Sequence, residues 1–279
     1  MRIISIIVYM DRKKTKAQVL SQGILAEGIM DLRLLTDFEG EVCPGQFVGV
    51  YTRSEARLLP RPISICEAQK KENGLVLRLV YRIAGQGTAE FALLGEGAHV
   101  DLIGILGNGF PVDVTAGPSD EGLPGKALVV GGGIGIPPLL GLTRALTENG
   151  TKVTAVLGYR DSSLFLANEF RQAGAEVVIS TEDASAGIKG NVVDAMREND
   201  LTADVLYSCG PLPMLKGVKA FASENGIKAY ISLEERMACG VGACLACVCR
   251  TEHEDPHSHV CNARICADGP VFAAEEVVL

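Results

Sequence analysis

The sequence predicts an antiparallel six-stranded β-barrel, then a doubly wound parallel sheet, then a short cysteine-rich subdomain. Three observations support this order. In residues 1–112, short runs of β-branched or alternating apolar residues are separated by turns, and helical periodicity is nearly absent. In residues 124–232, short apolar strands alternate with helices, a pattern typical of a parallel sheet. Residues 233–279 carry six of the nine cysteines.

The N-terminal part shows six strand-like runs at regular spacing, which is typical of a small antiparallel barrel. The runs are residues 2–9, 17–20, 29–35, 46–51, 63–67 and 75–83. We interpret the apolar start as a strand rather than a signal peptide, because it lacks a small-residue cleavage site and leads directly into charged residues. The glycines of 104–110 are expected to form turns that close the barrel, and 112–125 to form the linker.

Within the barrel, Arg61 stands between two prolines in the run Leu-Pro-Arg-Pro-Ile-Ser-Ile. Pro60 and Pro62 fix an extended backbone, and a planar guanidinium held in this way can grip a pyrophosphate. Ser64 lies three residues later, so in a regular strand it would face the opposite side. An edge strand with an exposed arginine is the alternative interpretation.

A second candidate phosphate site follows the run Val80, Tyr81 and Arg82. Thr88 is expected to be the N-cap of the next helix, and Gly87 to allow close approach of the backbone. Free N–H groups at a helix N-terminus suit phosphate, and Tyr81 is expected to pack on a flat ring. A plain turn is the alternative for Gly-x-Gly-Thr alone, but its combination with the Arg-Pro-x-Ser run is more specific.

The middle part is predicted to bind a dinucleotide at the end of its first strand. Strands are expected at 127–130, 152–157, 175–180, 204–208 and 228–232, with helices near 138–149, 164–173, 192–198 and 213–225. The first strand ends in glycines at Gly131, Gly132, Gly133 and Gly135. A glycine turn between a strand and a helix is where a dinucleotide pyrophosphate sits, although Ile136 stands where the strict G-x-G-x-x-G pattern has its last glycine. A tight turn without a ligand is the alternative.

Two further positions follow strands of the middle part. Asp161 would favour a free ribose 2′-hydroxyl and Arg160 a 2′-phosphate, so this position does not separate NAD from NADP. Cys209 ends the fourth strand in the run Ser-Cys-Gly-Pro, where a ligand contact is expected. A buried small hydrophobic residue is the alternative interpretation of this cysteine.

The cysteine-rich part contains Cys239, Cys244 and Cys247 in a C-x4-C-x2-C spacing, which is typical of a plant-type 2Fe–2S cluster. The spacing leaves the fourth ligand open between Cys261 and Cys266. A zinc site, which prefers paired C-x2–4-C knuckles, and a disulfide loop are the alternatives.

Other side chains near this loop are interpreted as bystanders. Cys249 would share a face with Cys247 in an extended segment and is a substitute candidate for a ligand. His253, His257 and His259 lie in a polar stretch and are interpreted as solvated loop residues.

Composition argues against several other classes of function. The net charge is −8, whereas a nucleic-acid partner would require a basic face. No apolar run is long enough to span a bilayer, so no membrane partner is expected. Nine cysteines without an export signal predict a reducing cytoplasm, where clustered thiolates hold metal rather than disulfides.

Together these motifs resemble the ferredoxin–NAD(P)H reductase superfamily, whose members join an FAD-binding barrel to a nucleotide-binding domain. The resemblance implies that Arg61 and Thr88 contact the FAD pyrophosphate, that Ser64 lies near the isoalloxazine, and that Cys209 lies near the nicotinamide. Ile63 replaces the tyrosine usual in the family. The implied cofactor-binding residues are Arg61, Pro62, Ile63, Ser64, Val80, Tyr81, Arg82, Gly87, Thr88, Gly131, Gly132, Gly133 and Gly135.

Over essentially the whole chain, the sequence is similar to the family of electron-transfer subunits of NAD-linked dihydroorotate dehydrogenase of type B. Pro-Gly-Gln-Phe, Arg-Pro-Ile-Ser, Gly-x-Gly-Thr, Leu-Gly-Asn-Gly-Phe, Gly-Gly-Gly-Ile-Gly and the cysteine loop occur in that order. The family's fourth cluster ligand precedes Asp-Gly-Pro-Val-Phe by two positions. The resemblance therefore implies a 2Fe–2S cluster on Cys239, Cys244, Cys247 and Cys266.

The same resemblance implies a route from dihydroorotate to a separate FMN-containing catalytic subunit, then to the cluster, FAD and NAD. It implies a heterotetramer with two copies of each subunit, within pyrimidine (UMP) biosynthesis. One alternative is the small subunit of an NADH-dependent ferredoxin–NADP oxidoreductase, which shares nearly all the motifs. Another is a zinc-bearing interaction module on a reductase-like scaffold.

Overall fold

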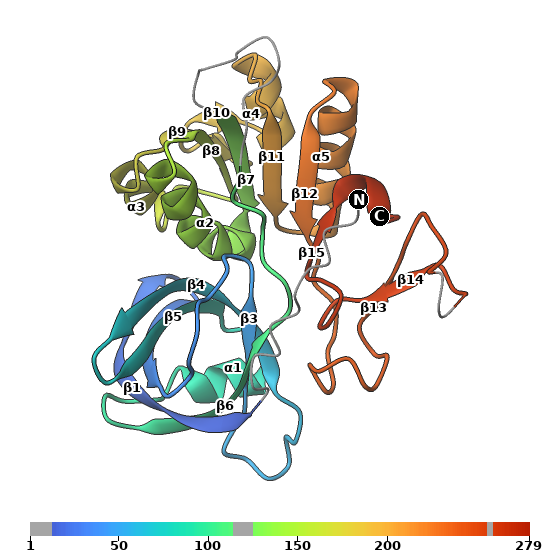
Figure 1. Ribbon diagram of the computed structural model, residues 1–279. Helices are drawn as coiled ribbons and strands as arrows, with labels where there is room; N and C mark the ends of the chain where they lie inside the picture. Colours follow the sequence, from blue (N-terminus) through green and yellow to red (C-terminus); the bar gives the residue numbers. More distant parts are fainter. Residues whose placement is uncertain (1–12, 114–124, 256–258) are drawn as a thin grey trace.

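The computed structural model describes residues 13–113, 125–255 and 259–279. The strand predicted at 2–9, most of the predicted linker and His257 lie outside these ranges. The N-terminal part is a closed barrel in the order β1-β2-β5-β4-β3-β6, with every neighbouring pair antiparallel (Figure 1). Its strands are β1 (Lys14–Ala26), β2 (Ile29–Thr36), β3 (Phe47–Val50), β4 (Arg61–Lys71), β5 (Gly74–Arg82) and β6 (His99–Leu106).

The barrel prediction is confirmed, but one of its strands was assigned wrongly. Gly104 was expected in a turn, and it lies instead inside β6, which pairs with β1 and β3 and closes the barrel. The alternation in β6 supports this arrangement, because Val100 and Leu102 are buried while His99 is exposed. A glycine inside a strand weakens the sequence signal for that strand.

The middle part is a seven-stranded sheet in the order β10-β9-β8-β7-β11-β12-β15, parallel except for β15 at its edge. Its strands are β7 (Lys126–Gly132), β8 (Lys152–Tyr159), β9 (Glu176–Thr181), β10 (Ile188–Lys189), β11 (Val205–Cys209), β12 (Lys228–Ser232) and β15 (Val271–Ala273). Its helices are α2 (Pro137–Glu148), α3 (Ala167–Gln172), α4 (Val192–Glu198) and α5 (Leu212–Glu224). The predicted alternation of strands and helices is therefore confirmed.

The alternating residues of β7 show why the sheet is doubly wound. Ala127 and Val129 pack in one core with apolar residues of α2 and α3. Leu128 and Val130 pack in a second core with apolar residues of α4 and α5. Successive side chains of a strand point to opposite faces, so both faces of this sheet are covered by helices, as a buried parallel sheet requires.

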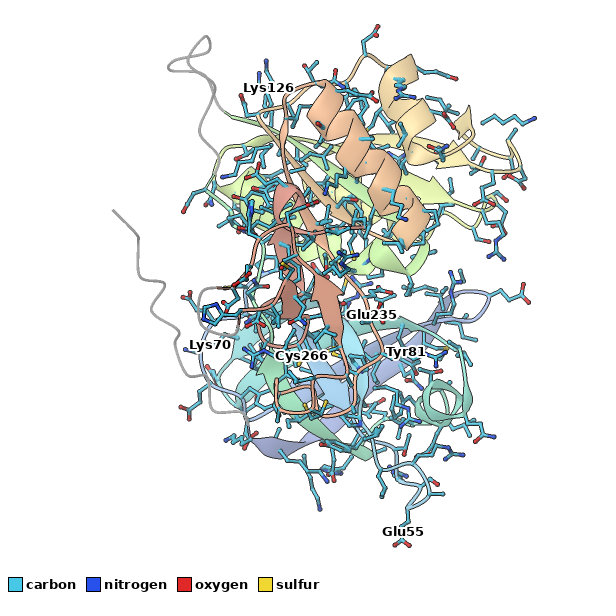
Figure 2. All side chains as sticks on the ribbon, turned by 90° about the vertical axis from the view of Figure 1, so that its right-hand side faces the viewer. Glu55, Lys70, Tyr81, Lys126, Glu235 and Cys266 are labelled. Atoms are coloured by element: carbon cyan, nitrogen blue, oxygen red, sulfur yellow. The ribbon has the colours of Figure 1, made fainter. Side chains whose placement is uncertain are left out.

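The cysteine-rich part is attached to both other parts of the chain. It contributes β15 to the large sheet, beside β12, and forms a two-stranded hairpin of β13 (Val248–Arg250) and β14 (Asn262–Arg264). Phe47 and Leu106 of the barrel share a buried core with Cys247 and Cys266. Accordingly, Cys266 lies at mid-height in Figure 2, between the barrel below and the large sheet above. The short β10, β13, β14 and β15 were not predicted, because two or three residues give no readable periodicity.

A cluster of charged side chains joins the barrel to the α/β domain. The Arg78 guanidinium, on β5, is 4% exposed and pairs with Asp31 at 2.8 Å, Glu67 at 2.8 Å and Glu169 of α3 at 2.5 Å. Arg144 of α2 also pairs with Glu67, at 2.5 Å. The Arg78 guanidinium holds the pKa of Glu169 below its ordinary value. These contacts fix how two helices of the α/β domain sit against the barrel.

None of the helices in the described parts of the chain has both the length and the apolar character needed to cross a membrane.

Candidate functional site: four thiols and two nucleotide-binding segments

The four cysteines predicted to hold a cluster lie together as two neighbouring pairs. The thiol of Cys239 is within hydrogen-bonding reach of Cys244, and the thiol of Cys266 is within reach of Cys247. Cys239 is also close enough to Cys266 for their charges to interact. In the described ranges, no group of three or more His, Cys, Asp or Glu meets the geometry of a site for a single metal ion. The four thiols thus lie as two neighbouring pairs and do not converge on one point.

Backbone N–H groups point at the sulfurs, as the glycines of the loop permit. Val241 N–H donates to Cys239 Sγ at 3.4 Å, and Gly242 N–H donates to Cys266 Sγ at 3.1 Å. Gly240 and Gly242 have positive φ, at 71° and 85°, which glycine adopts without strain. Hydrogen bonds of this kind to the sulfurs tune the potential of an iron–sulfur cluster.

The thiols do not share one electrostatic environment. Burial raises the pKa of Cys239, but hydrogen bonds from the backbone of Val241 and Cys244 and from the Cys244 thiol outweigh burial and lower it to about 6. Burial, the hydrogen bond with Cys247 and the charge of Cys247 raise the pKa of Cys266 to about 12. Several thiolates at this spacing repel one another, and a bound cationic centre removes that repulsion. The donor set therefore fits a thiolate-bound iron–sulfur group.

The alternative ligands lie outside this group of thiols. Cys261 is exposed. Cys249 is half-buried on β13, where its backbone pairs with Ala263, and burial raises its pKa. His259 is exposed and lies 3.0 Å from the Glu254 carboxylate, and His253 is also exposed. The structure thus brings Cys266, rather than Cys261, beside the C-x4-C-x2-C loop.

Arg61 lies directly against the start of α1 (Gln86–Phe91). A Cβ added at Gly87 would overlap the Arg61 guanidinium, so a larger residue would push the guanidinium away from the start of the helix. The structure corrects one expectation here: the N-cap of α1 is Gly85, and Thr88 is at position N3. The Thr88 hydroxyl donates to the Gly85 carbonyl at 3.0 Å and accepts from the backbone N–H groups of Ala84 and Gly85. Its hydroxyl therefore already has partners within the turn.

The aromatic ring expected to stack on a flat cofactor is not available for that role. Tyr81 is 2% exposed, and its ring packs edge-on against Phe91 with centroids 6.2 Å apart. Its hydroxyl donates to Gln22 Oε1 at 3.1 Å. Tyr81 therefore belongs to the barrel core and can reach a ligand only through its backbone. The neighbouring Val80 is buried, and Arg82 is exposed.

The remaining candidates on β4 pair with β3 in unbroken register, from Arg61 opposite Val50 to Ser64 opposite Phe47. Pro62 is exposed, while Arg61, Ile63 and Ser64 are half-buried. Arg61 and Ser64 therefore lie on opposite faces at the start of the strand, so one compact ligand group does not contact both.

The glycine turn after β7 packs against the loop that follows β11. Gly133 to Gly135 form a 3-10 turn, and Gly133 has φ of +53°. A Cβ at Gly135 would overlap the Cys209 carbonyl, and a Cβ at Gly132 would lie 2.5 Å from Met214 Sδ. The closest atom to a Cβ at Gly133 is Arg82 Nη2, at 3.5 Å. The turn therefore places Cys209 and Arg82 beside the predicted pyrophosphate position.

The variant Gly135→Ala is expected to weaken NADH binding. The added methyl group meets the backbone of Cys209 and Gly210, which cannot rotate away, so the turn itself must shift. Displacements of this kind, about 1 Å in size, can cost on the order of 100-fold in a function that depends on position. NADH titration of the FAD-loaded protein measures the effect. Gly23→Ala is the matched control because no atom lies within 4 Å of its added Cβ, and equal affinity in both variants would contradict the role of the turn.

Glu234 is a candidate that sequence reasoning missed. Loss of hydration beside the surrounding protein atoms raises the pKa of Glu234, although part of its surface is exposed to solvent. The positive charge of Arg82 acts in the opposite direction and lowers this pKa. The charge of Glu234 also acts on the buried thiol of Cys209, whose pKa is raised by burial. Its position just after the carboxyl end of β12, beside other strand ends that form the site, is the signal that could have identified it.

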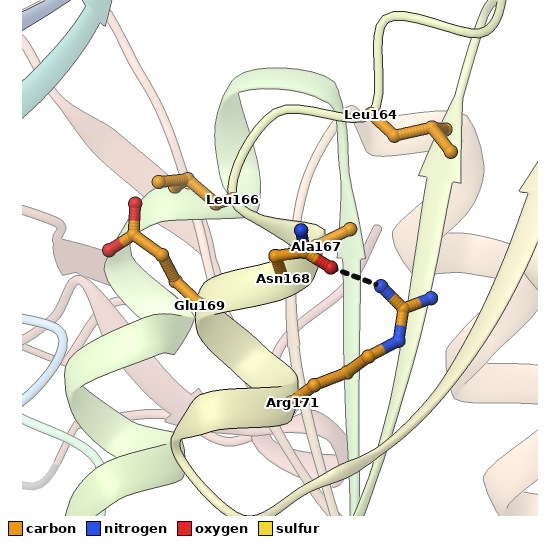
Figure 3. Close-up of a pocket in the computed structure, with 6 residues that line it drawn as sticks. All are labelled: Leu164, Leu166, Ala167, Asn168, Glu169 and Arg171. Carbon is orange, nitrogen blue, oxygen red and sulfur yellow. Dashed lines mark hydrogen bonds between the residues drawn. The ribbon is translucent and has the colours of Figure 1, made fainter.

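The position expected to contact an adenosine ribose carries two ordered carboxylates. Asp161 accepts a hydrogen bond from Ser163 N–H at 2.8 Å, and Asp183 accepts one from Ser185 N–H at 2.9 Å. Hydrogen bonds from the N–H and hydroxyl of Ser163 hold the pKa of Asp161 below its ordinary value, and those from the hydroxyl and N–H of Ser185 do the same for Asp183. A separate depression beside α3 is formed by Leu164, Leu166, Ala167, Asn168, Glu169 and Arg171 (Figure 3). There, Arg171 donates to Asn168 at 3.0 Å, and none of the predicted site residues is present.

Comparison with known proteins agrees with this division of the chain. Residues 234–278 match the family model described as the iron–sulfur cluster binding domain of dihydroorotate dehydrogenase B. Residues 129–220 match the oxidoreductase NAD-binding domain. A solved structure of an NADH-dependent reduced ferredoxin–NADP oxidoreductase is 31% identical, with a TM-score of 0.80, over 94% of this chain and 89% of that one.

Full-length relatives are more similar in sequence. The dihydroorotate dehydrogenase B (NAD(+)) electron transfer subunit of Geobacillus kaustophilus is 43% identical over 95% of this chain and 99% of its own length. The same subunit of Shouchella clausii is 43% identical over 97% of this chain and 100% of its own length. The chain therefore belongs to the family of dihydroorotate dehydrogenase B electron transfer subunits.

Proposed function

We propose that this chain passes electrons from an FMN-containing catalytic subunit, which oxidises dihydroorotate, to NAD during pyrimidine (UMP) synthesis. The observation that carries the proposal is the group of four thiols in the segment that matches the iron–sulfur domain of this family. The barrel and the sheet beside that group carry two separate segments suited to phosphates. One chain thus combines the parts needed to exchange single electrons and to reduce a pyridine nucleotide.

The cluster is assigned to the paired thiols. Cys239 and Cys244 would supply the ligands of one iron, and Cys247 and Cys266 those of the other, as their proximity suggests. The N–H groups of Val241 and Gly242 stabilise the negative charge on the sulfurs. When bound, FAD converts the two-electron chemistry of NAD into the one-electron chemistry of the cluster.

The flavin and the nicotinamide nucleotide are assigned to the junction of the barrel and the sheet. Arg61, Gly87 and the start of α1 would hold the FAD pyrophosphate, with Thr88 ordering that turn. The other barrel residues assigned to FAD are Pro62, Ile63, Ser64, Val80, Tyr81 and Arg82, with Tyr81 contributing its backbone. The NAD pyrophosphate is assigned to Gly131, Gly132, Gly133 and Gly135. Cys209 and Glu234 would lie by the nicotinamide.

We also propose the domain limits 1–112, 124–232 and 233–279 for the flavin, nucleotide and cluster parts. The contribution of β15 to the large sheet means that the third part is a subdomain that depends on the second. Because the thiols are clustered for metal binding, we place the protein in the reducing cytoplasm.

The catalytic subunit is proposed to dock on the cluster loop. Cys244 is exposed, and the neighbouring Leu245 is 62% exposed with a positive φ of 57°. Val248 and Val260 are also exposed, at 38% and 42%. Exposed apolar side chains in the segment proposed to hold a redox centre fit a protein partner, since contact there shortens the path for electrons. We propose two copies of each subunit in the complex.

Co-purification with the catalytic subunit tests the proposed function. The complex is expected to reduce NAD with dihydroorotate as the donor and to contain FMN, FAD, iron and sulfide. The ferredoxin–NADP type of oxidoreductase is the second candidate, supported by the 31% identical structure. A complex that reduces NADP with ferredoxin and ignores dihydroorotate would replace our proposal with that candidate. A colourless protein after anaerobic reconstitution would exclude both.

A further inference from the structure

Asn108 connects the end of the barrel to the segment that follows Cys266. It lies two residues beyond β6, in the Leu-Gly-Asn-Gly-Phe run. Its side chain donates to the carbonyls of Asp268 at 3.1 Å and Val271 at 2.9 Å, and it accepts from Val271 N–H at 3.0 Å. Its backbone N–H donates to the Gly269 carbonyl at 2.7 Å. A single residue thus makes four hydrogen bonds across the junction.

The chain around Asn108 is packed so that the junction has little freedom. A Cβ at Gly107 would lie 2.5 Å from Pro270 Cδ and 2.9 Å from the Gly269 carbonyl. Gln46 Nε2 donates to the Gly107 carbonyl at 2.8 Å, which ties this turn to the barrel. A Cβ at Gly240 would lie 3.3 Å from Leu106 Cδ1, so the cluster loop also rests on the end of β6.

The contacts continue from Asn108 to the thiols. Asp268, whose carbonyl Asn108 binds, accepts two hydrogen bonds from the Arg264 guanidinium, both at 2.9 Å. Arg264 donates at 3.2 Å to the carbonyl of Gly242, the residue whose N–H binds Cys266 Sγ. Cys266 is itself two residues before Asp268. Every step of this path is a direct contact, so a shift at Asn108 displaces the segment that holds Cys266.

The amide of asparagine fits this position in a way that other side chains do not. The segment from Asp268 to Val271 offers two carbonyls and one N–H group to it, and an amide supplies two donors and one acceptor. A carboxylate has the same shape but only accepts, so it would face two carbonyl oxygens without a hydrogen.

We propose that Asn108 is a positioning residue that fixes the place of the cluster relative to the barrel, and therefore to the flavin. The inference rests on the proposed assignment of Cys266 as a cluster ligand and of FAD to the barrel. Asn108 binds the backbone of Asp268, Gly269 and Val271, and its proposed role is to set how far apart and at what angle the cluster and the flavin are held. The electron step between flavin and cluster depends on this placement, whereas flavin reduction by NADH does not.

The test uses the full chain in complex with its catalytic subunit, as Asn108→Ala and Asn108→Asp. Both variants are expected to keep FAD and iron, to reduce their flavin with NADH at the wild-type rate, and to pass electrons to the cluster about tenfold or more slowly. The electron paramagnetic resonance signal of the reduced cluster should change, and the Val271 amide should exchange hydrogen faster. Asn225→Ala is the matched control, since the Asn225 side chain also binds a backbone carbonyl, that of Phe221 at 2.8 Å, but at the C-terminal end of α5.

Three results would overturn the inference. One is a wild-type rate of cluster reduction in both variants. Another is an equal slowing of both electron steps, which a general loss of structure produces. The third is loss of the cluster from Asn108→Asp, since the residue would then form the site rather than place it. Failure of the proposed function can be told apart from failure of the Asn108 inference. In that case the wild-type protein itself would lack the cluster or the dihydroorotate activity.

Discussion

Cys266→Ser is expected to lose the iron–sulfur cluster while FAD remains bound. In the proposed cluster the Cys266 thiolate is an iron ligand, and Cys266 is 2% exposed beside Cys247, so no solvent ligand can readily take its place. Removal of outer-shell partners alone typically costs about 10–100-fold in metal affinity or activity, and loss of a direct ligand should cost more. Iron and acid-labile sulfide per chain, with visible absorbance, measure the cluster, and released flavin measures FAD.

Cys261→Ser is the matched control for this prediction. Both residues are cysteines of the C-terminal segment, but Cys261 is exposed and lies outside the group of four thiols. We expect the control to keep its cluster and its dihydroorotate-dependent reduction of NAD. The reverse pattern, with the cluster lost from Cys261→Ser and kept in Cys266→Ser, would assign the fourth ligand to Cys261. Retention in both would point to Cys249, which is half-buried close to Cys247.

The sequence identifies three of the four thiols readily and the fourth only by resemblance. Cys239, Cys244 and Cys247 lie on one short loop, so their spacing alone predicts convergence. The fourth thiol, that of Cys266, lies beside the other three because the β13–β14 hairpin reverses the chain. Just after this hairpin, Ile265 N–H donates to the Cys247 carbonyl at 2.8 Å. Strands of three residues have no readable period, so this return of the chain could not be predicted from the residues.

The roles of Tyr81 and Thr88 show a second limit of the sequence. Tyr81 was correctly predicted in a strand and Thr88 near the start of a helix, but Thr88 is at N3 rather than at the N-cap. The polar atoms of both residues are bound to partners that spacing does not reveal. The Tyr81 hydroxyl meets Gln22, which is far away in the chain, and the Thr88 hydroxyl turns back to Gly85. By contrast, the α/β domain was predicted well because its strands and helices follow their own local periods.

Arg78→Met is expected to destabilise the protein and to slow flavin reduction by NADH. The substitution leaves Asp31, Glu67 and Glu169 facing one another without the guanidinium that is 4% exposed between them. Removing one partner of a buried ion pair costs about 3–5 kcal/mol, and we expect about 3 kcal/mol here because the carboxylates are partly exposed. The thermal midpoint of the FAD-loaded protein, compared with wild type at the same pH, measures the effect.

The effect on flavin reduction follows from where the charges lie. Asp31 and Glu67 belong to the barrel, whereas Glu169 belongs to α3 and Arg144, which also binds Glu67, belongs to α2. Without Arg78 the carboxylates repel each other across the junction to which we assign the flavin and the nicotinamide. We expect flavin reduction to slow by about tenfold or more, because the step depends on the alignment of these two groups.

Arg197→Met is the control that distinguishes the domain-joining role of Arg78 from the effect of removing any arginine. Arg197 pairs with Glu224 at 3.0 Å, but both side chains are more than half exposed and both lie within the α/β domain. An exposed pair of this kind contributes about 0–1 kcal/mol, so this variant should melt and react like the wild type. If Arg78→Met matched Arg197→Met in both measurements, the charged cluster would not hold the domains together. If Arg78→Met lost stability but kept the wild-type rate of flavin reduction, the charged cluster would not be needed to align the flavin and nicotinamide sites. The packing of α2 on the barrel, where Gly141 meets the Cys66 carbonyl, would then be sufficient for that alignment.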